Sequence, residues 1–206
     1  PYRRYAGSQL DRIDTEHEQY SLRHFIELGD AVDLTTVLYR HEFQRAWYKL
    51  QDVTGASLST ILSNPSENAE RLSWLQGADS AVNALRIRNN HRAYFAEGGQ
   101  SVLNWRSAWG AVEHEMSFGL RWHRDEEDRF QQDDRYQMLD GNMVLTSAGL
   151  PGSQENRVVR AQALSFYAQD EIRLDSWIIT PGLRWESINL KRLDYALRPY
   201  GRDAGP

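Results

Sequence analysis

Five arginines are the residues in this 206-residue sequence whose type and spacing best suit chemistry. Arg86, Arg88 and Arg92 lie where a long connecting segment re-enters a strand-like run, and Arg157 and Arg160 occupy the matching place after a second such segment. A planar guanidinium binds a carboxylate through two parallel hydrogen bonds. The grouping therefore predicts a site for an anionic ligand. In the alternative interpretation, each arginine pairs with Asp or Glu on neighbouring strands or with lipid phosphates.

Motifs for catalysis and metal binding are incomplete. The run His41-Glu42-Phe43-Gln44-Arg45 begins like the zinc-protease motif, but Arg45 stands where the second His is required. No nucleophile elbow, phosphate loop or dinucleotide-binding motif occurs, so we expect no enzyme, no catalytic residue and no cofactor. The charged run from His123 to Arg129 could supply metal ligands. A solvated loop base is the simpler interpretation, and we predict no metal site.

The composition excludes several classes of protein. A formal net charge of -5 argues against a nucleic-acid partner, which would select a basic face. The absence of Cys excludes a disulfide framework and a thiolate zinc site. No uncharged run reaches the roughly 18 residues of a membrane helix. A transmembrane β-barrel remains possible, because only every second residue of its strands must be apolar.

Alternation of apolar and polar residues is the strongest structural pattern. Five of the six even-numbered positions from Val112 to Trp122 are apolar, whereas the odd-numbered positions from Glu113 to His123 carry no large apolar group. Period two predicts a strand with one apolar and one polar face. The same pattern follows Leu164, where Asp170 interrupts the apolar positions for no reason visible in the sequence.

Turns and connections predict how these strands are joined. We expect an all-β, antiparallel transmembrane β-barrel segment of about six long strands with three short turns and two long extracellular loops. The expected strands cover residues 14–28, 31–47, 91–106, 111–124, 157–174 and 177–192, and the short turns fall at 29–30, 107–110 and 175–176. The long connections, 48–90 and 125–156, would lie at the opposite end from the turns. That asymmetry is typical of an outer-membrane barrel.

Each long connection has a predicted element of its own. In the first, Asn64 can cap a short helix, Pro65 suits its first turn, and Gly77 can end it. In the second, residues 136–146 surround Asp140-Gly141-Asn142 and predict a small hairpin.

Four stretches resemble a known family. FYAQDEI at 166–172, TPGLRWE at 180–186, EHEMSFGLRWHRDEEDRF at 113–130 and MLDGNMVLT at 138–146 resemble barrel strands of TonB-dependent outer-membrane receptors. Residues 19–50 are similar to the ferric-citrate type of iron-chelate receptor within that family. The resemblance covers most of the chain, from about residue 20 to 193.

The resemblance implies a 22-stranded barrel in the outer membrane of a Gram-negative bacterium, with an N-terminal plug domain inside it. Residues 1–206 would be one internal part of the β-barrel domain, and the plug domain is absent from them. The implied partners are a ferric chelate such as ferric citrate or a siderophore, outer-membrane lipid and lipopolysaccharide, and TonB through the missing plug region. Polar residues expected to line the lumen are Arg121, Gln169, Glu171, Arg173, Arg184 and Glu186.

Two alternatives stay open at this point. A TonB-dependent receptor for a non-iron cargo would have the same barrel with different loop chemistry. A soluble all-β binding module, such as a sandwich, would have shorter strands whose apolar faces pack on one another.

Overall fold

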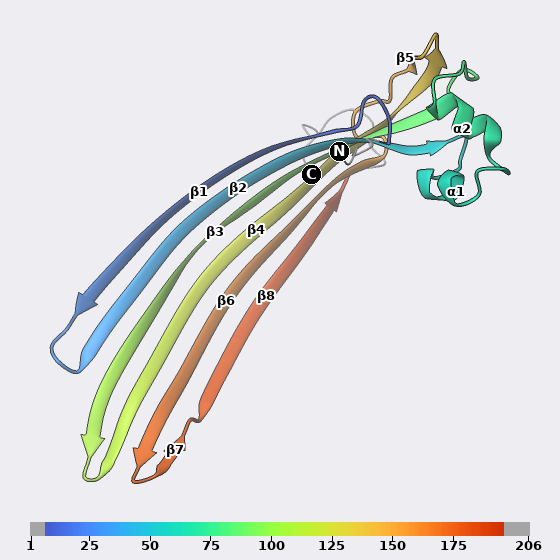
Figure 1. The fold of residues 1–206 in the computed structure, drawn as a ribbon. Coiled ribbons are helices and arrows are strands. Elements are labelled where there is room, and N and C mark those ends of the chain that lie inside the picture. Colours follow the sequence, from blue (N-terminus) through green and yellow to red (C-terminus); the bar gives the residue numbers. More distant parts are fainter. Residues whose placement is uncertain (1–6, 196–206) are drawn as a thin grey trace.

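The computed structural model describes residues 7–195 and consists of one curved antiparallel sheet with a small cap at one end (Figure 1). Its elements in chain order are β1 (Arg12–Glu27), β2 (Val32–Val53), α1 (Leu58–Ser63), α2 (Ala69–Leu75), β3 (Leu85–Trp109), β4 (Val112–Leu139), β5 (Asn142–Ser147), β6 (Glu155–Leu174), β7 (Trp177–Ile179) and β8 (Gly182–Asp194). The expected all-β antiparallel fold is confirmed.

The strands pair in chain order, as successive hairpins require. The sheet runs β1-β2-β3-β4-β6, β5 is a short additional partner of β4, and both β7 and β8 pair with β6. β7 and β8 share one register against β6, because Ile179 faces Ile172 and Gly182 faces Gln169. Pro181 separates them, since it has no backbone N–H to give to the ladder. The expected strand 177–192 is therefore one pairing interrupted at its proline.

Short turns gather at one end of the sheet, and the cap lies at the other (Figure 1). The turn before β2 contains Gly29 at φ 101°, a left-handed conformation that favours glycine. The turn between β3 and β4 is shorter than the predicted 107–110, because β3 continues to Trp109 and β4 begins at Val112. The third turn falls at 175–176, as expected.

The register sorts the side chains into two faces. Leu38, Gly99, Trp122 and Leu164 lie opposite one another on four neighbouring strands, so they share one face. We call this the outer face and the opposite one the inner face. Along the half of the sheet nearer the turns, the outer face carries large apolar side chains that are 38% to 69% exposed: Leu38, Leu120, Trp122, Leu164, Phe166, Leu183 and Trp185. Such a surface is expected of a barrel wall in contact with lipid.

Asp170, the interruption of the apolar pattern, has a partner on the outer face. Its Oδ2 lies 2.7 Å from Nδ1 of His114, a second polar residue among the apolar positions. The His114 side chain is only 9% exposed, and the ring of Trp109 lies 4.5 Å from its ring centroid. The two polar groups thus satisfy one another in part on adjacent strands, while Oδ1 of Asp170 is buried and has no hydrogen-bond partner within residues 7–195.

The strands extend well beyond the predicted loop boundaries, so the connection 125–156 is mostly strand, and both ends of the connection 48–90 are strand as well. β2 continues to Val53, β3 begins at Leu85, and β4 continues to Leu139. The run from His123 to Arg129 is part of β4, and its charged side chains alternate between the two faces. The loop base predicted there is wrong, because dense charge is not by itself a sign of loop structure. A strand accepts charge on both faces where both are wet and oppositely charged side chains lie across the ladder.

The first connection holds two helices instead of one. Ser57 caps α1 by accepting a hydrogen bond from the Thr60 amide. Asn64 ends α1 rather than beginning a helix, and α2 starts only after Asn68. Gly77 follows α2 at φ 111°, in agreement with its predicted role. In residues 7–195 neither helix has the length and apolar character needed to cross a membrane.

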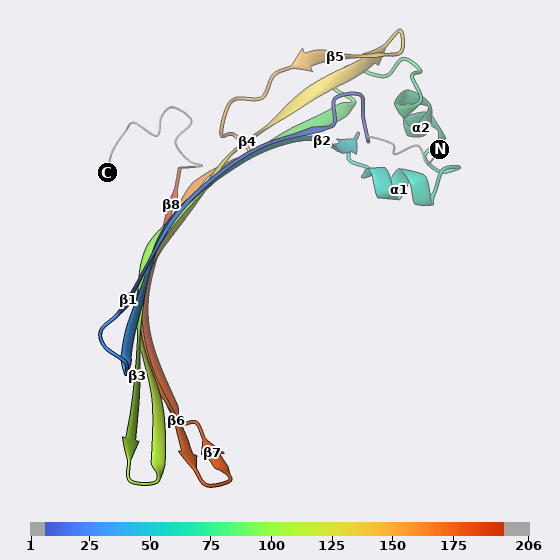
Figure 2. The same ribbon diagram turned by 60° about the vertical axis from the view of Figure 1, so that its left-hand side comes forward.

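A small apolar core joins the helices to the ends of β2, β3 and β4. Its buried members are Leu50, Val53, Ile61, Ala84, Leu85, Ile87 and Met138. The predicted hairpin is present as β4 and β5, with Asp140 and Gly141 both at positive φ, the geometry of a tight two-residue turn. Figure 2 shows these strand ends bending over toward α1 and α2. The core therefore gives the cap a fixed attachment to the sheet.

Candidate ligand-binding site

Four arginines form a row across the inner face, near the cap. Arg45 on β2 lies opposite Arg92 on β3, Arg92 opposite Arg129 on β4, and Arg129 opposite Arg157 on β6. We call these four residues the arginine row. Like charges directly opposite one another destabilise a sheet, because their Cβ atoms are only about 4.5–5.5 Å apart. Their accumulation here creates a positive strip that favours an anion.

Two carboxylates compensate part of this charge. Glu127 bridges two members of the row, with Oε1 at 3.2 Å from Arg92 Nη1 and 2.8 Å from Arg129 Nε. Burial alone would raise the pKa of Glu127, but the hydrogen bond from Arg129 and the charges of Arg129 and Arg92 lower it below its ordinary value. Glu155 lies 2.8 Å from Arg157 Nε. Four cations thus face two carboxylates in direct contact with them.

Arg45 is the least satisfied member of the row. Its Nε atom is buried and has no hydrogen-bond partner within residues 7–195. The same is true of Arg157 Nε, but Arg157 has the Glu155 carboxylate beside it, whereas Arg45 makes no ion pair within these residues. A buried, unpartnered guanidinium nitrogen is costly, because it has lost water and gained no acceptor. An anionic ligand on the inner face would supply that acceptor.

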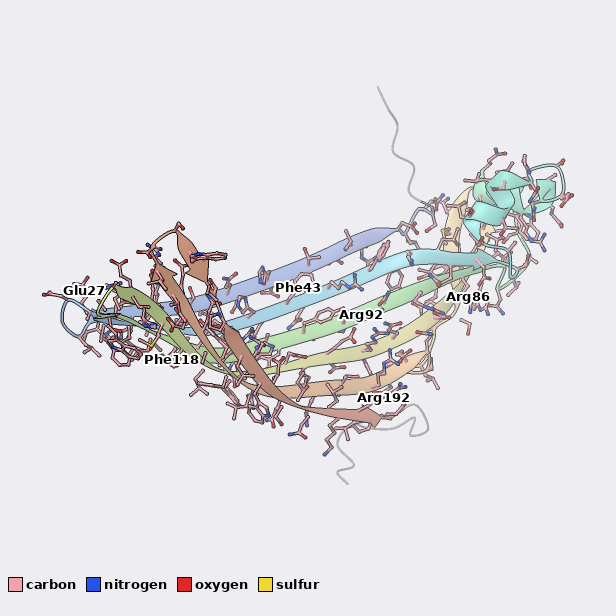
Figure 3. The ribbon with its side chains drawn as sticks, turned by 90° about the horizontal axis from the view of Figure 1, so that it is seen from below. Glu27, Phe43, Arg86, Arg92, Phe118 and Arg192 are labelled. Atoms are coloured by element: carbon pink, nitrogen blue, oxygen red, sulfur yellow. The ribbon has the colours of Figure 1, made fainter. Side chains whose placement is uncertain are left out.

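An aromatic shelf borders the row on the side toward the turns. Phe43 and Tyr94 lie opposite one another on β2 and β3, with ring centroids 5.8 Å apart in a stacked arrangement. His17 on β1 meets the Phe43 ring edge-on at 5.9 Å. Figure 3 labels Phe43 and Arg92 on these two neighbouring strands. The site thus combines a cationic strip with a flat apolar surface beside it.

Arg86 and Arg88 lie on the same face as the row but closer to the cap, and both are tied to carboxylates. Arg88 donates two hydrogen bonds to Asp133, at 2.7 and 3.0 Å, and these raise the pKa of its guanidinium. Arg86 binds Asp52, whose side chain is 6% exposed, and also reaches Asp133. Two cations meet two carboxylates here, so the cluster is neutral and holds the strand ends together.

Arg160 lies on the opposite face from the other four predicted ligand-binding residues. It is three residues from Arg157 on β6, and an odd separation along a strand reverses the face. Its Nε lies 2.5 Å from Oε2 of Glu126 on the outer face.

The sequence prediction missed Arg45 and Arg129. Both lie in stretches that the prediction assigned to other roles, the end of one strand and the base of a loop. Only the register between hairpins that are distant in sequence brings them opposite Arg92 and Arg157.

The six polar residues expected to line the lumen all lie on the inner face. They are Arg121, Gln169, Glu171, Arg173, Arg184 and Glu186. Arg121 donates a hydrogen bond to the Tyr39 hydroxyl at 3.0 Å, and that hydroxyl lies 2.6 Å from His123 Nδ1. Within the described part of the chain, no group of three or more His, Asp or Glu side chains is arranged to hold a metal ion.

Nearly the whole chain matches one known protein family. The family described as TonB dependent receptor-like, beta-barrel, matches residues 1–204. The chain belongs to this family. Members of the TonB-dependent receptor family are transporters of the Gram-negative outer membrane and not enzymes. No curated protein matches the chain in sequence.

Solved structures of this family share the fold. The ferric citrate transporter FecA in its unliganded form has a TM-score of 0.58 and 17% identity, covering 90% of this chain and 22% of that one. The ferric-catecholate import receptor Fiu from E. coli K12 has a TM-score of 0.63 and 12% identity, covering 92% and 26%. BauA, the ferric preacinetobactin receptor from Acinetobacter baumannii, has a TM-score of 0.58 and 11% identity, covering 87% and 25%. The TonB-dependent receptor segment described here therefore spans about a quarter of the length of these receptors.

Proposed function

We propose that this segment is the ligand-capturing wall of an outer-membrane receptor that imports an anionic ferric chelate, such as ferric citrate or a carboxylate siderophore, with energy supplied through TonB. The arginine row is the observation that carries this proposal. Within residues 7–195, two carboxylates contact the four guanidiniums, which leaves donors for the carboxylates of a chelate. The cargo is carried through, and no bond in it is broken.

The inner-face residues have three different roles in this proposal. Arg45, Arg92, Arg129 and Arg157 contact the chelate, and the shelf of Phe43 and Tyr94 packs against its apolar parts. Arg86 and Arg88 lie above them and fix the strand ends, because Asp52 and Asp133 already neutralise their charges. The six lumen-lining residues face the plug domain of the complete receptor. The outer face contacts membrane lipid, and the basic side chains above its apolar part adjoin lipopolysaccharide.

A receptor for a non-iron cargo is the alternative that shares this barrel. A neutral saccharide would not need the arginine row, whose like charges cost stability unless an anion offsets them. An anionic cargo without iron would satisfy the row equally well. The experiment must therefore compare the ferric chelate with its metal-free form.

The test uses the complete receptor that contains this segment, purified in detergent. Isothermal titration measures binding of ferric citrate and of citrate alone, with the variant R45Q/R129Q compared with wild type. We expect saturable ferric citrate binding that the double substitution weakens by at least about tenfold, as the loss of two charge-assisted contacts predicts. Arg184→Gln is the matched control, because Arg184 lies on the same face, is 54% exposed and pairs with Glu186. Its affinity should equal that of wild type.

Two results would overturn the proposal. A folded receptor that does not bind ferric citrate contradicts this choice of chelate, and tight binding of citrate alone contradicts the requirement for iron. Equal binding by wild type and the double variant would remove the arginine row from the ligand site.

A further inference from the structure

Three of the six histidines in the chain lie on the inner face, at the aromatic shelf or on its side toward the turns. His17 on β1 lies opposite Phe43 of the shelf, and His41 is two residues from Phe43 on β2. His123 on β4 lies in the next row toward the turns, which also contains Tyr39. Two residues of strand span about 6.6 Å, so all three imidazoles lie within about 13 Å of the shelf along the strands.

The rings of these histidines form a continuous ladder with Tyr39. His17 and His41 are stacked, with ring centroids 6.4 Å apart. Tyr39 connects His41 to His123, because its ring centroid lies 5.6 Å from the first and 5.9 Å from the second. We call His17, His41, Tyr39 and His123 the histidine ladder. It extends from β1 to β4 along the border of the proposed chelate site.

Gly98 makes the contact between Tyr39 and His123 possible. The three residues lie opposite one another on β3, β2 and β4, and a Cβ at Gly98 would overlap the Tyr39 hydroxyl. Without that Cβ the phenol lies across β3, and its oxygen is 2.6 Å from His123 Nδ1. His123 Nε2 lies 3.2 Å from Oδ2 of Asp125. Both ring nitrogens of His123 thus have an oxygen partner, which fixes the orientation of the ring.

The ladder can change the charge of the site, because histidine is the side chain that gains and loses its charge between about pH 5 and pH 8. Within residues 7–195, the four arginines of the row and the ladder are accompanied by three carboxylates, Glu127, Glu155 and Asp125. Neutral imidazoles therefore leave this part of the inner face with one positive charge, and three protonated imidazoles leave it with four. Protonation thus multiplies the positive charge even though Asp125 lies beside His123.

The other groups that face the ladder do not cancel this effect. Four arginines face it from β1, β2, β3 and β4, namely Arg23, Arg45, Arg92 and Arg121. The carboxylates that face it in the described part of the chain are Asp125 and Glu127, which are already counted. Tyr94 on β3 is neutral in this pH range. On β6, Ala161 and Ala163 lie beside Asp125 and His123 and carry no charge.

We propose that the histidine ladder makes chelate binding proton-linked, so that the receptor takes up protons as it binds the anionic chelate. This inference rests on the proposed function, because it concerns the same inner-face site. A bound anion favours the protonated form of a nearby imidazole, and by reciprocity each protonated imidazole favours the anion. Affinity for the chelate therefore rises as the pH falls through the range in which histidine titrates. A unit charge about 10 Å away changes the affinity roughly threefold in a site open to water and salt.

Isothermal titration of the complete detergent-purified receptor with ferric citrate tests this proposal. The variant H17Q/H41Q should bind as wild type does at about pH 8, where imidazoles are neutral, and roughly tenfold more weakly at about pH 5.5. Comparison of the two proteins at one pH removes the effect of the chelate's own protonation, which is the same for both. Titrations in two buffers of different ionisation heat should also show that wild type takes up more protons on binding than the variant does.

The matched control is H24Q/H91Q, which removes two histidines from the outer face. His24 is exposed, as His17 is, and His91 is half-buried, as His41 is. The control should keep the wild-type affinity at both pH values. Heat-modifiable migration in gels establishes that each variant is folded. If H17Q/H41Q does not fold, His41→Gln alone serves, and it should weaken binding roughly threefold at the lower pH.

The possible results separate this inference from the proposed cargo. Loss of affinity that is equal at both pH values, no loss at the lower pH, or an equal loss in the outer-face control would overturn the inference and leave ferric citrate as the cargo. A folded wild-type receptor that binds no ferric citrate at either pH would contradict the proposed function and this inference with it.

Discussion

Glu127→Gln should make an anionic chelate bind more tightly while it makes the barrel less stable. Glu127 is the carboxylate that bridges Arg92 and Arg129 in the arginine row. Its removal leaves the positive charge of the row less compensated, so the affinity for an anion rises. The same change leaves two half-buried guanidiniums without their shared partner, so the free energy of unfolding falls.

The two magnitudes follow from the position of the carboxylate. At about 8 Å from a bound anion, with an effective dielectric constant of about 20, a unit charge contributes roughly 2 kcal/mol. Screening by water and salt reduces this to about 1 kcal/mol, or about fivefold tighter binding. The Glu127 side chain is 25% exposed. Loss of its hydrogen bonds to charged partners should cost about 1–3 kcal/mol of stability.

Titration of the complete receptor with ferric citrate measures the first effect, and urea unfolding in detergent measures the second. Glu171→Gln is a close control, because Glu171 lies on the inner face of the same sheet and pairs with an arginine two residues away at 2.6 Å, as Glu127 pairs with Arg129 at 2.8 Å. It is far from the row, so neither affinity nor stability should change by more than a few tenths of a kcal/mol. Weaker chelate binding by the Glu127 variant would refute the reasoning, because it would make the carboxylate a ligand contact instead of a competitor for the arginines.

Three further outcomes are expected from the same structure. The pKa of Glu127 is lower in the folded state than its ordinary value of about 4.5, so its contribution to stability is full above that value and declines as the pH falls through the folded pKa. Measured as a function of acid pH, the free energy of unfolding should show this loss in wild type and not in E127Q. Gly119→Ala should destabilise the barrel by about 1–3 kcal/mol in urea, because an added Cβ would overlap the ring of Tyr167 on the inner face. Asp170→Ala should lower the free energy of unfolding by about 1–3 kcal/mol, because it leaves His114 without its partner. The double variant H114L/D170L should recover most of that loss, and equal instability of the two variants would argue against the pair as the cause.

The sequence predicts the wall of the barrel well because period two is a local property. Each side chain between Val112 and Arg124 reports its own face, and no long-range information is needed to assign it. The ends of the strands are harder to predict from the sequence. β4 continues through His123 to Arg129 because cross-strand ion pairs such as Arg92 with Glu127 stabilise charged residues in the ladder. Those pairs depend on register between hairpins, which local alternation does not contain.

The helical cap shows the same limit in another form. Asn64 and Ser57 are both good helix caps by residue type, and local preference alone cannot choose between them. The structure selects Ser57, because α1 then places Ile61 in the small core beside Leu50 and Leu85. Burial of that side chain decides where the helix begins, and burial depends on strand ends that are distant along the chain.

For the arginines, an odd or even separation along the strand decides the face of the sheet on which each side chain lies, whereas closeness in the sequence does not. Arg86, Arg88 and Arg92 are separated by even numbers of residues on one strand, so a strand must place all three on one face. Arg157 and Arg160 are separated by three, so the same strand must place them on opposite faces. Grouping them by position near a loop base joined two different surfaces, the arginine row on the inner face and the pair of Arg160 with Glu126 on the outer face. The distinction has a chemical consequence, because only the arginines of the inner face can contribute to the proposed chelate site. Under the proposed function, R157Q should therefore weaken ferric citrate binding and R160Q should leave it at the wild-type value, and equal effects of the two substitutions would argue against a chelate site on the inner face.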